Sequence, residues 1–255
     1  VPLVHVDLDP EWLGRNYEPT VAVRADLRAA LTALADAATG DAARADRVES
    51  LAADRRAWRE GFADDLTSDD APVKPQRVMG ELNDRVPAEG ILVSATSLPG
   101  FFSGAFYETE RAGLHYLQAR GSDGINVCLP QALGVQAARP DTPVVALSGD
   151  GGIGYHVADL ETAVREDLPV TVVVTNNDSL GSSKMSQMGT YNVDVSTDFH
   201  PGVDYAQVAR GFGAAGERIE DPDRFGPALS EAIAADEPTL LDVQVDPFAA
   251  PPILV

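Results

Sequence analysis

The chain has 255 residues, which is enough for one large domain or for a domain and a half. Hydrophobic residues make up 44% of it and can fill a core, but no stretch approaches about 18 uninterrupted apolar residues, so we expect no membrane span. The formal charge of −21 excludes a nucleic-acid-binding face and an anionic membrane surface as partner. The single cysteine, Cys128, excludes an internal disulfide framework and makes the cytoplasm the expected compartment.

The acidic balance has two explanations that the sequence leaves open. Only two lysines, Lys74 and Lys184, occur among the 19 basic residues, and Asp is more frequent than Glu. An Asp-rich, Lys-poor surface is tolerated in a high-salt cytoplasm, because salt screens the repulsion between like charges. An arginine-biased, GC-rich genome would produce a similar composition.

The first nine residues, Val1–Asp9, predict a buried strand. Val4, Val6 and Leu8 alternate with polar residues, as expected for a strand that packs on one face. A chain that starts inside a core strand is expected to be a fragment, a processed product or one half of a split polypeptide.

The rest of the first part predicts a second short strand and two helices. The strand covers 21–23, Asp26 is the expected N-cap of the first helix, and the second helix covers 42–62. The segment 63–75 is acidic, contains prolines and has no periodicity, so it predicts a linker with a domain boundary near Pro72.

Beyond the linker, strands alternate with helices, which is typical of a parallel sheet covered on both faces. We therefore expect an α/β fold with a doubly wound sheet. The stretches 96–104 and 176–203 predict irregular loops. The expected elements are helices over 76–85, 129–138 and 157–164, strands over 91–94, 144–147 and 170–174, and a closing helix–strand–helix–strand set that ends at 240–245.

A glycine-rich turn, Gly149–Gly154, follows a predicted strand and precedes a helix. It matches the G-x-G-x-x-G pattern of dinucleotide-binding proteins. That pattern requires an acidic residue at the end of the next strand to hold a ribose hydroxyl, whereas the next strand here ends in Asn176 and Asn177. Asp150 would also direct a carboxylate at the pyrophosphate, which is repulsive unless a cation lies between them.

A divalent cation would remove both objections. Asp150 and Asn177 follow successive strands, and a right-handed crossover can place such strands near each other with their carboxyl ends on one edge. Carboxylate, amide and carbonyl oxygens are hard ligands, which suit Mg²⁺ or Ca²⁺. The glycines would let backbone N–H groups approach a phosphate.

The segment 149–177 resembles the motif of thiamine diphosphate-dependent enzymes. It begins with Gly-Asp-Gly and ends with Asn-Asn, and Asn177 lies 27 residues after Asp150, at the family's spacing. The resemblance extends over nearly the whole chain and points to the group of acetolactate synthase, benzoylformate decarboxylase and benzaldehyde lyase. It implies that 1–62 is the end of a Rossmann-like middle domain, that 63–75 is a linker, and that 76–255 is the domain that binds thiamine diphosphate and magnesium.

The resemblance also implies roles for individual residues. Asp150 and Asn177 correspond to metal ligands through their side chains, and Ser179 corresponds to a ligand through its carbonyl. Ile125 matches the bulky residue that bends the cofactor, and the backbone of Asp123 and Ile125 would hold its aminopyrimidine ring. The residues implied to approach the diphosphate are Thr96, Ser97, Gly149, Gly151, Gly152 and Gly181, with Asn177 beside them.

Two departures from the family pattern lie near these residues. Relatives commonly carry a glycine-rich G-x-G-x-x-L-P run where this chain has Asn126 and Cys128. Leu98 and Pro99 stand where many acetolactate synthases have Gln-His, so the resemblance to that enzyme is weakened.

The family's domain that carries the catalytic glutamate has no counterpart in this sequence. The resemblance therefore implies that the chain holds the cofactor and metal but needs a complementary polypeptide with the pyrimidine-binding domain, in a homo- or hetero-oligomer with two-fold symmetry. The expected function is cleavage or formation of a C–C bond next to a carbonyl of a small substrate, as decarboxylase, carboligase or synthase. Two alternatives remain open: a non-catalytic cofactor-binding regulatory subunit, and a nicotinamide-dependent oxidoreductase.

Overall fold

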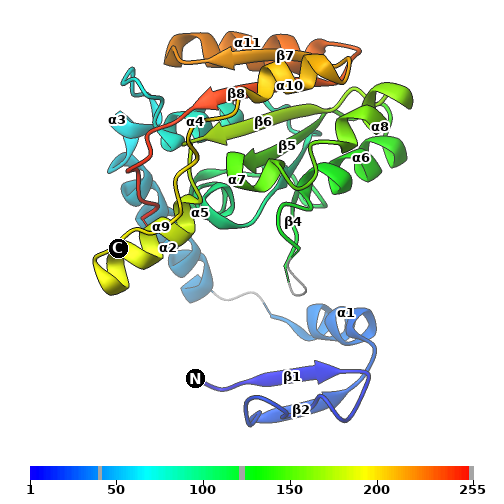
Figure 1. Ribbon diagram of the computed structural model, residues 1–255. Helices are drawn as coiled ribbons and strands as arrows, with labels where there is room; N and C mark the ends of the chain where they lie inside the picture. The colour runs from blue at the N-terminus through cyan, green and yellow to red at the C-terminus, as the bar shows by residue number, and fades with distance from the viewer. Residues whose placement is uncertain (40–41, 121–123, 253–255) are drawn as a thin grey trace. The chain divides into compact units, whose positions relative to one another are not determined.

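The computed structural model describes residues 1–39, 42–120 and 124–252, and the chain divides into two compact units, Val1–Trp58 and Arg59–Val255. In the described part of the first unit, β1 (Val4–Asp7) pairs in parallel with β2 (Val21–Arg24). Helix α1 (Leu27–Ala37) follows, and α2 (Ala42–Glu60) runs through the boundary between the units (Figure 1).

The structure of the first unit confirms one prediction and contradicts another. The side chain of Asp26 accepts a hydrogen bond from the backbone N–H of Ala29 at 3.0 Å, so the predicted N-cap is confirmed. The prediction of a buried strand over Val1–Asp9 is wrong, because Val4 and Leu8 are exposed and β1 is shorter. Two strands and a helix offer too little surface to cover a strand on both sides.

The segment predicted as a linker, 63–75, is a folded part of the second unit. It contains the short helix α3 (Ala63–Leu66), and the guanidinium group of Arg77 donates hydrogen bonds to the carbonyls of Thr67 and Ser68 at 3.0 and 3.1 Å. Acidic and proline-containing segments resemble linkers in sequence, but here the partly buried Arg77 binds the backbone of this one. The assignment of the parts of the chain to family domains stays a prediction.

The second unit is built on a parallel sheet, which confirms the predicted fold class. Within the described residues it has six strands in the order β4-β3-β5-β6-β8-β7. The strands are β3 (Ile91–Ser94), β4 (Tyr116–Gln118), β5 (Val144–Gly149), β6 (Thr171–Asn176), β7 (Ala215–Ile219) and β8 (Thr239–Gln244).

Helices cover both faces of this sheet, as Figure 1 shows. Neighbouring residues along a strand point to opposite faces: Leu92 belongs to an apolar cluster with side chains of α4, α5 and α11, whereas Val93 belongs to one with side chains of α6, α8 and α10. Both faces are buried, which explains the apolar runs Val144–Leu147 in β5 and Val172–Val174 in β6. The helices are α4 (Pro75–Arg85), α5 (Ser97–Phe106), α6 (Cys128–Ala138), α7 (Asp150–Ile153), α8 (Asp159–Arg165), α9 (Gly181–Tyr191), α10 (Tyr205–Gly211) and α11 (Pro222–Ala234).

Two predicted loops are helical in the structure. Helix α5 replaces the loop predicted over 96–104, and it buries Phe102 and Phe106 against the core. Helix α9 lies inside the predicted irregular stretch 176–203. Both helices contain glycine and serine residues, which lower the helix propensity of these segments. The spacing of four between the two phenylalanines is nevertheless a helical signal. A search of the described helices finds none that is both long and apolar enough to span a bilayer.

Candidate functional site

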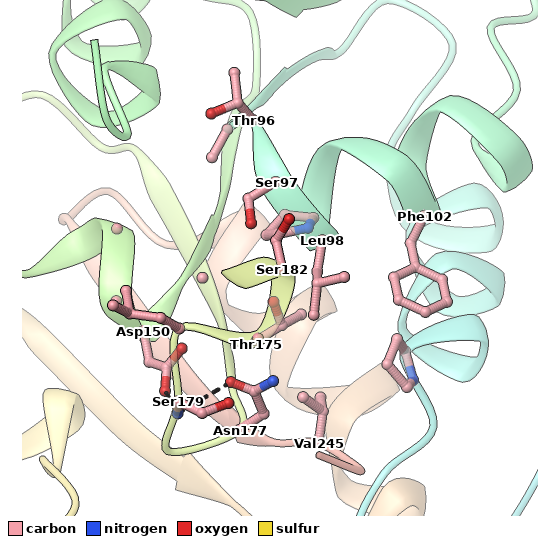
Figure 2. Close-up of a pocket in the computed structure, with 18 of the residues that line it drawn as sticks. Thr96, Ser97, Leu98, Phe102, Asp150, Thr175, Asn177, Ser179, Ser182 and Val245 are labelled. Carbon is pink, nitrogen blue, oxygen red and sulfur yellow. Dashed lines mark hydrogen bonds between the residues drawn. The ribbon is translucent and has the colours of Figure 1, made fainter. Parts of the chain in front are cut away.

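The carboxyl ends of β5 and β6 meet at one edge of the sheet. The two strands pair directly, with Gly149 opposite Thr175, so α7 after β5 and the turn after β6 begin side by side. A cavity of about 320 Å³ opens at this edge. Figure 2 shows Asp150, Asn177 and Ser179 close together within it.

The structure brings nearly all of the predicted site residues to this cavity. They come from the loop between β3 and α5, from the segment before α6, from the end of β5 with α7, and from the turn between β6 and α9. Asp123 lies outside the described residues. The predicted residues that line the cavity are Thr96, Ser97, Ile125, Gly149, Asp150, Gly151, Gly152, Asn177, Ser179 and Gly181.

The side chains of Asp150 and Asn177 converge on one backbone group. The N–H of Ser179 donates to Asp150 Oδ2 at 3.0 Å and to Asn177 Oδ1 at 3.2 Å (Figure 2). The turn that makes this possible places Asp178 in the left-handed region, at φ 52°. Two oxygen ligands from neighbouring strands therefore lie within reach of a single small ion.

The carboxyl group of Asp150 is buried and titrates far from its ordinary range. Only 3% of the residue is exposed, and burial raises the pKa of the carboxyl to about 7. The backbone N–H groups of Gly151 and Ser179 lower this pKa, but the nearby Asp178 raises it again. A bound cation would favour the charged carboxylate, since it supplies the opposite charge that the protein does not place there.

The oxygen atoms around Asp150 suit a hard divalent cation. Ser179 Oγ is buried and has no hydrogen-bond partner among the described residues. A search of the same residues finds no group of three or more His, Cys, Asp or Glu side chains that could hold a metal. A cation at Asp150 would therefore complete its coordination with amide, carbonyl and ligand oxygens, which is the chemistry of Mg²⁺ rather than of Zn²⁺.

Glycines keep the cavity open beside these oxygens. A Cβ atom added to Gly181 would lie 2.6 Å from Asn177 Nδ2, and one added to Gly151 would lie 2.7 Å from Leu180 Cδ2. Side chains at these positions would push into the residues that form the site. The backbone N–H groups can approach a ligand closely because nothing projects from the Cα atoms.

The far wall of the cavity comes from α5, which the sequence did not predict as a helix. Ser97 begins it at φ 67°, a left-handed conformation that costs a residue with a Cβ atom roughly 1–2 kcal/mol. Thr96 and Ser97 thereby reach the cavity as predicted, and Leu98, Pro99 and Phe102 add an apolar surface that was not predicted.

A buried hydrogen-bond network holds the backbone of Asp150 in place. The hydroxyl of Tyr205 donates to the backbone oxygen of Asp150 at 2.8 Å, and burial raises the pKa of this tyrosine to about 12, so the hydroxyl stays protonated. Asp242 is fully buried and accepts from Tyr205 N at 3.0 Å and from Asn176 Nδ2 at 2.9 Å. Tyr205 and Asp242 lie outside the 149–177 motif in sequence, so no local pattern indicates them.

Comparison with known families identifies the family of this chain. The model of the thiamine pyrophosphate enzyme C-terminal binding domain matches residues 100–243, which is more than half of the chain. The chain belongs to this family. Thiamine pyrophosphate is another name for thiamine diphosphate, so the resemblance inferred from the motif is confirmed. The match includes both strands that carry Asp150 and Asn177, and it removes the basis for the nicotinamide-dependent alternative.

The relatives of this thiamine diphosphate family member have the names of different enzymes. The acetolactate synthase large subunit of Mycobacterium tuberculosis is 30% identical and glyoxylate carboligase of Escherichia coli O157:H7 is 28% identical; the matches cover 89% and 91% of this chain. The solved thiamine diphosphate-dependent 4-hydroxybenzoylformate decarboxylase of Rhodococcus jostii RHA1 superposes with a TM-score of 0.77 at 25% identity over 96% of the chain. The chain spans only 41–44% of the length of these proteins.

Proposed function

We propose that this chain is the half of a thiamine diphosphate-dependent enzyme that holds the cofactor and a magnesium ion. The single observation that carries the proposal is the convergence of Asp150 and Asn177 on the Ser179 N–H inside a glycine-lined cavity. In a member of this family, that geometry suits a metal ion bridging the protein to the diphosphate.

Each residue of the cavity has a defined task in this proposal. Asp150 and Asn177 hold Mg²⁺ through side-chain oxygens and Ser179 through its carbonyl, and Ca²⁺ fits the same donors. Ile125 is 54% exposed at the mouth of the cavity, where a bulky aliphatic side chain can hold the cofactor bent. The groups assigned to the diphosphate are the hydroxyls of Thr96 and Ser97 and the backbone at Gly149, Gly151, Gly152 and Gly181; the backbone of Asp123 and Ile125 is assigned to the aminopyrimidine.

The proposed reaction is the making or breaking of a C–C bond next to a carbonyl. When bound, thiamine diphosphate supplies a nucleophilic carbon and an electron sink for that bond. The apolar wall of Leu98, Pro99 and Phe102 keeps water from this side of the cavity, and the buried Asp150 anchors the charged end of the cofactor. Relatives named as synthase, carboligase and decarboxylase all match this half, so the proposal covers the class of reaction that they share.

We further propose that the catalytic glutamate is supplied by a segment outside these 255 residues, with the particle arranged about a two-fold axis. The relatives are more than twice as long as this chain, which supports a division of the site between two segments. The chain alone should then bind thiamine diphosphate without accelerating proton exchange at its C2 carbon. Rapid exchange in D₂O, followed by NMR on the chain at verified mass, would contradict this part of the proposal.

The metal assignment is tested by calorimetry on the 255-residue chain. We expect thiamine diphosphate to bind in the presence of Mg²⁺ and to lose its binding when the metal is chelated. Asp150→Ala should weaken binding by more than the roughly 10- to 100-fold that loss of a supporting group costs at a metal site. Asp141→Ala, which removes an exposed carboxylate outside the cavity, should bind normally. Unchanged affinity in Asp150→Ala would contradict the proposal.

A further inference from the structure

The two residues that depart from the family's glycine-rich run contact each other beside the cavity. Cys128 Sγ donates to Asn126 Oδ1 at 3.0 Å, and Ser148 Oγ lies 2.7 Å from the same oxygen. Burial raises the pKa of the Cys128 thiol to about 12, so the thiol keeps its proton and acts as a donor. With donors on that side, the carbonyl oxygen of the Asn126 amide faces Cys128 and Ser148.

The other end of this amide has no partner. Asn126 is 2% exposed and lines the cavity, and its Nδ2 is buried without a hydrogen-bond partner among the described residues. Leaving a buried donor unpaired is unfavourable, so native proteins rarely retain one without a reason. A ligand oxygen in the cavity would satisfy it.

The backbone shows that Asn126 is built into this place. Its φ is 53°, in the left-handed region that asparagine tolerates better than most residues with a Cβ atom. A Cβ atom added to Gly152 would lie 2.8 Å from Asn126 Cβ, so the asparagine side chain fills the space next to the turn that follows Asp150. Asn126 Cγ and Oδ1 would lie 3.1 and 3.3 Å from the same added atom, so the amide group lies beside the backbone assigned to the diphosphate.

We propose that the side-chain amide of Asn126 donates a hydrogen bond to a phosphate oxygen of the diphosphate bound in the cavity. The inference rests on the proposed function, because it requires that thiamine diphosphate binds there. It assigns a binding role to a residue that replaces one of the family's small residues. An anionic phosphate oxygen is the strongest acceptor that such a ligand offers to an N–H group.

Two variants separate the donor from the rest of the side chain. Asn126→Gly removes the side chain and keeps the left-handed backbone, whereas Asn126→Asp keeps an acceptor for Cys128 and Ser148 but replaces the donor with an oxygen. Asn83→Asp is the matched control, since Asn83 Nδ2 donates to the Phe106 carbonyl at 2.9 Å outside the cavity. Thermal melting establishes that each variant is folded; if Asn126→Asp does not fold, Asn126→Gly decides alone.

Affinity is measured by calorimetry at pH 8 with Mg²⁺, using thiamine diphosphate and inorganic diphosphate as separate probes. We expect Asn126→Gly to weaken both by roughly 10- to 100-fold, Asn126→Asp to weaken them more through repulsion, and Asn83→Asp to change neither. Unchanged affinity in Asn126→Gly would overturn the inference alone, as would an effect on thiamine diphosphate without one on inorganic diphosphate. Failure of the unaltered chain to bind either probe would overturn the proposed function and the inference with it.

Discussion

At the scale of single residues, the environment of the Asp150 carboxyl determines how the proposed site binds a metal. Its carboxyl is buried next to Asp178, and the groups that stabilise its charge are backbone N–H groups rather than a basic side chain. Such an environment is costly for a carboxylate in the empty site and becomes favourable once a cation is bound. The same burial that destabilises the metal-free fold therefore strengthens the interaction with the metal.

The pH dependence of stability should reveal this cost. Between the ordinary aspartate pKa of 3.8 and about 7, the folded metal-free chain holds a proton that the unfolded chain has released, so its free energy of unfolding falls as pH rises. We predict that Asp150→Asn raises the free energy of unfolding at pH 8 by roughly 1–4 kcal/mol and has little effect at pH 4.

Urea unfolding with a chelator present measures this difference at both pH values. Asp141→Asn controls for the loss of one exposed carboxylate in a chain of charge −21. A destabilised Asp150→Asn chain at pH 8 would show that the carboxylate is well stabilised without metal, contrary to the account given for the site.

At the scale of elements, α9 follows the turn that contains Asn177 and Ser179, and its first residues line the cavity. Its first residue, Gly181, is buried against Leu98 and Asn177, whereas Gly189 near its other end is exposed with open space around its Cα. Lys184 on the same helix pairs with Asp194 at 3.1 Å and with Asp198 at 2.6 Å, which fastens the following loop to it. A side chain would therefore clash with its neighbours at Gly181 but not at Gly189.

Alanine substitutions at these two glycines form a matched pair. Gly181→Ala should lower the free energy of unfolding by about 1–3 kcal/mol, because its Cβ would lie 2.5 Å from Leu98 Cδ1 and 2.6 Å from Asn177 Nδ2. Gly189→Ala should raise it by up to about 1 kcal/mol, since alanine favours the helix and meets no neighbour. Chemical denaturation checks both signs; equal effects at the two positions would show that Gly181 does not make a close approach.

Some elements of the second unit could be predicted from the sequence and others could not. Strands β3, β5 and β6 could be predicted because each is a short apolar run bounded by turn residues. Helices α5 and α9 were missed, because their many glycines and serines have low helix propensity; Ser97, Gly181, Ser182 and Ser183 among them line the cavity. Asp150 and Asn177 were found from one local motif, whereas the support from Tyr205 and Asp242 depends on contacts that only the folded chain creates.

At the scale of the whole molecule, negative charge is the dominant property. Both lysines of the chain, Lys74 and Lys184, pair with two carboxylates each, so neither ammonium group is left to offset the remaining acidic residues. The remaining surplus of acidic residues repels itself in dilute buffer. Salt should relieve this repulsion, since the Debye length falls from about 10 Å at 0.1 M to about 3 Å at 1 M.

We predict that the melting temperature rises between low and molar KCl if the composition reflects adaptation to salt. Thermal melting over a KCl series, with a neutral osmolyte at equal osmolality as the control, measures the electrostatic part. A melting temperature that stays flat would instead favour an arginine-biased genome as the origin of the composition.

The central claim is that Asp150 and Asn177 hold the metal that binds thiamine diphosphate. A crystal structure of the chain grown with Mn²⁺ and thiamine diphosphate tests it most directly, because Mn²⁺ replaces Mg²⁺ at oxygen ligands and gives an anomalous signal. The account predicts an anomalous peak about 2.1–2.2 Å from side-chain oxygens of both residues, in contact with the diphosphate. A diphosphate bound with its metal elsewhere, or bound in this cavity without one, would contradict it.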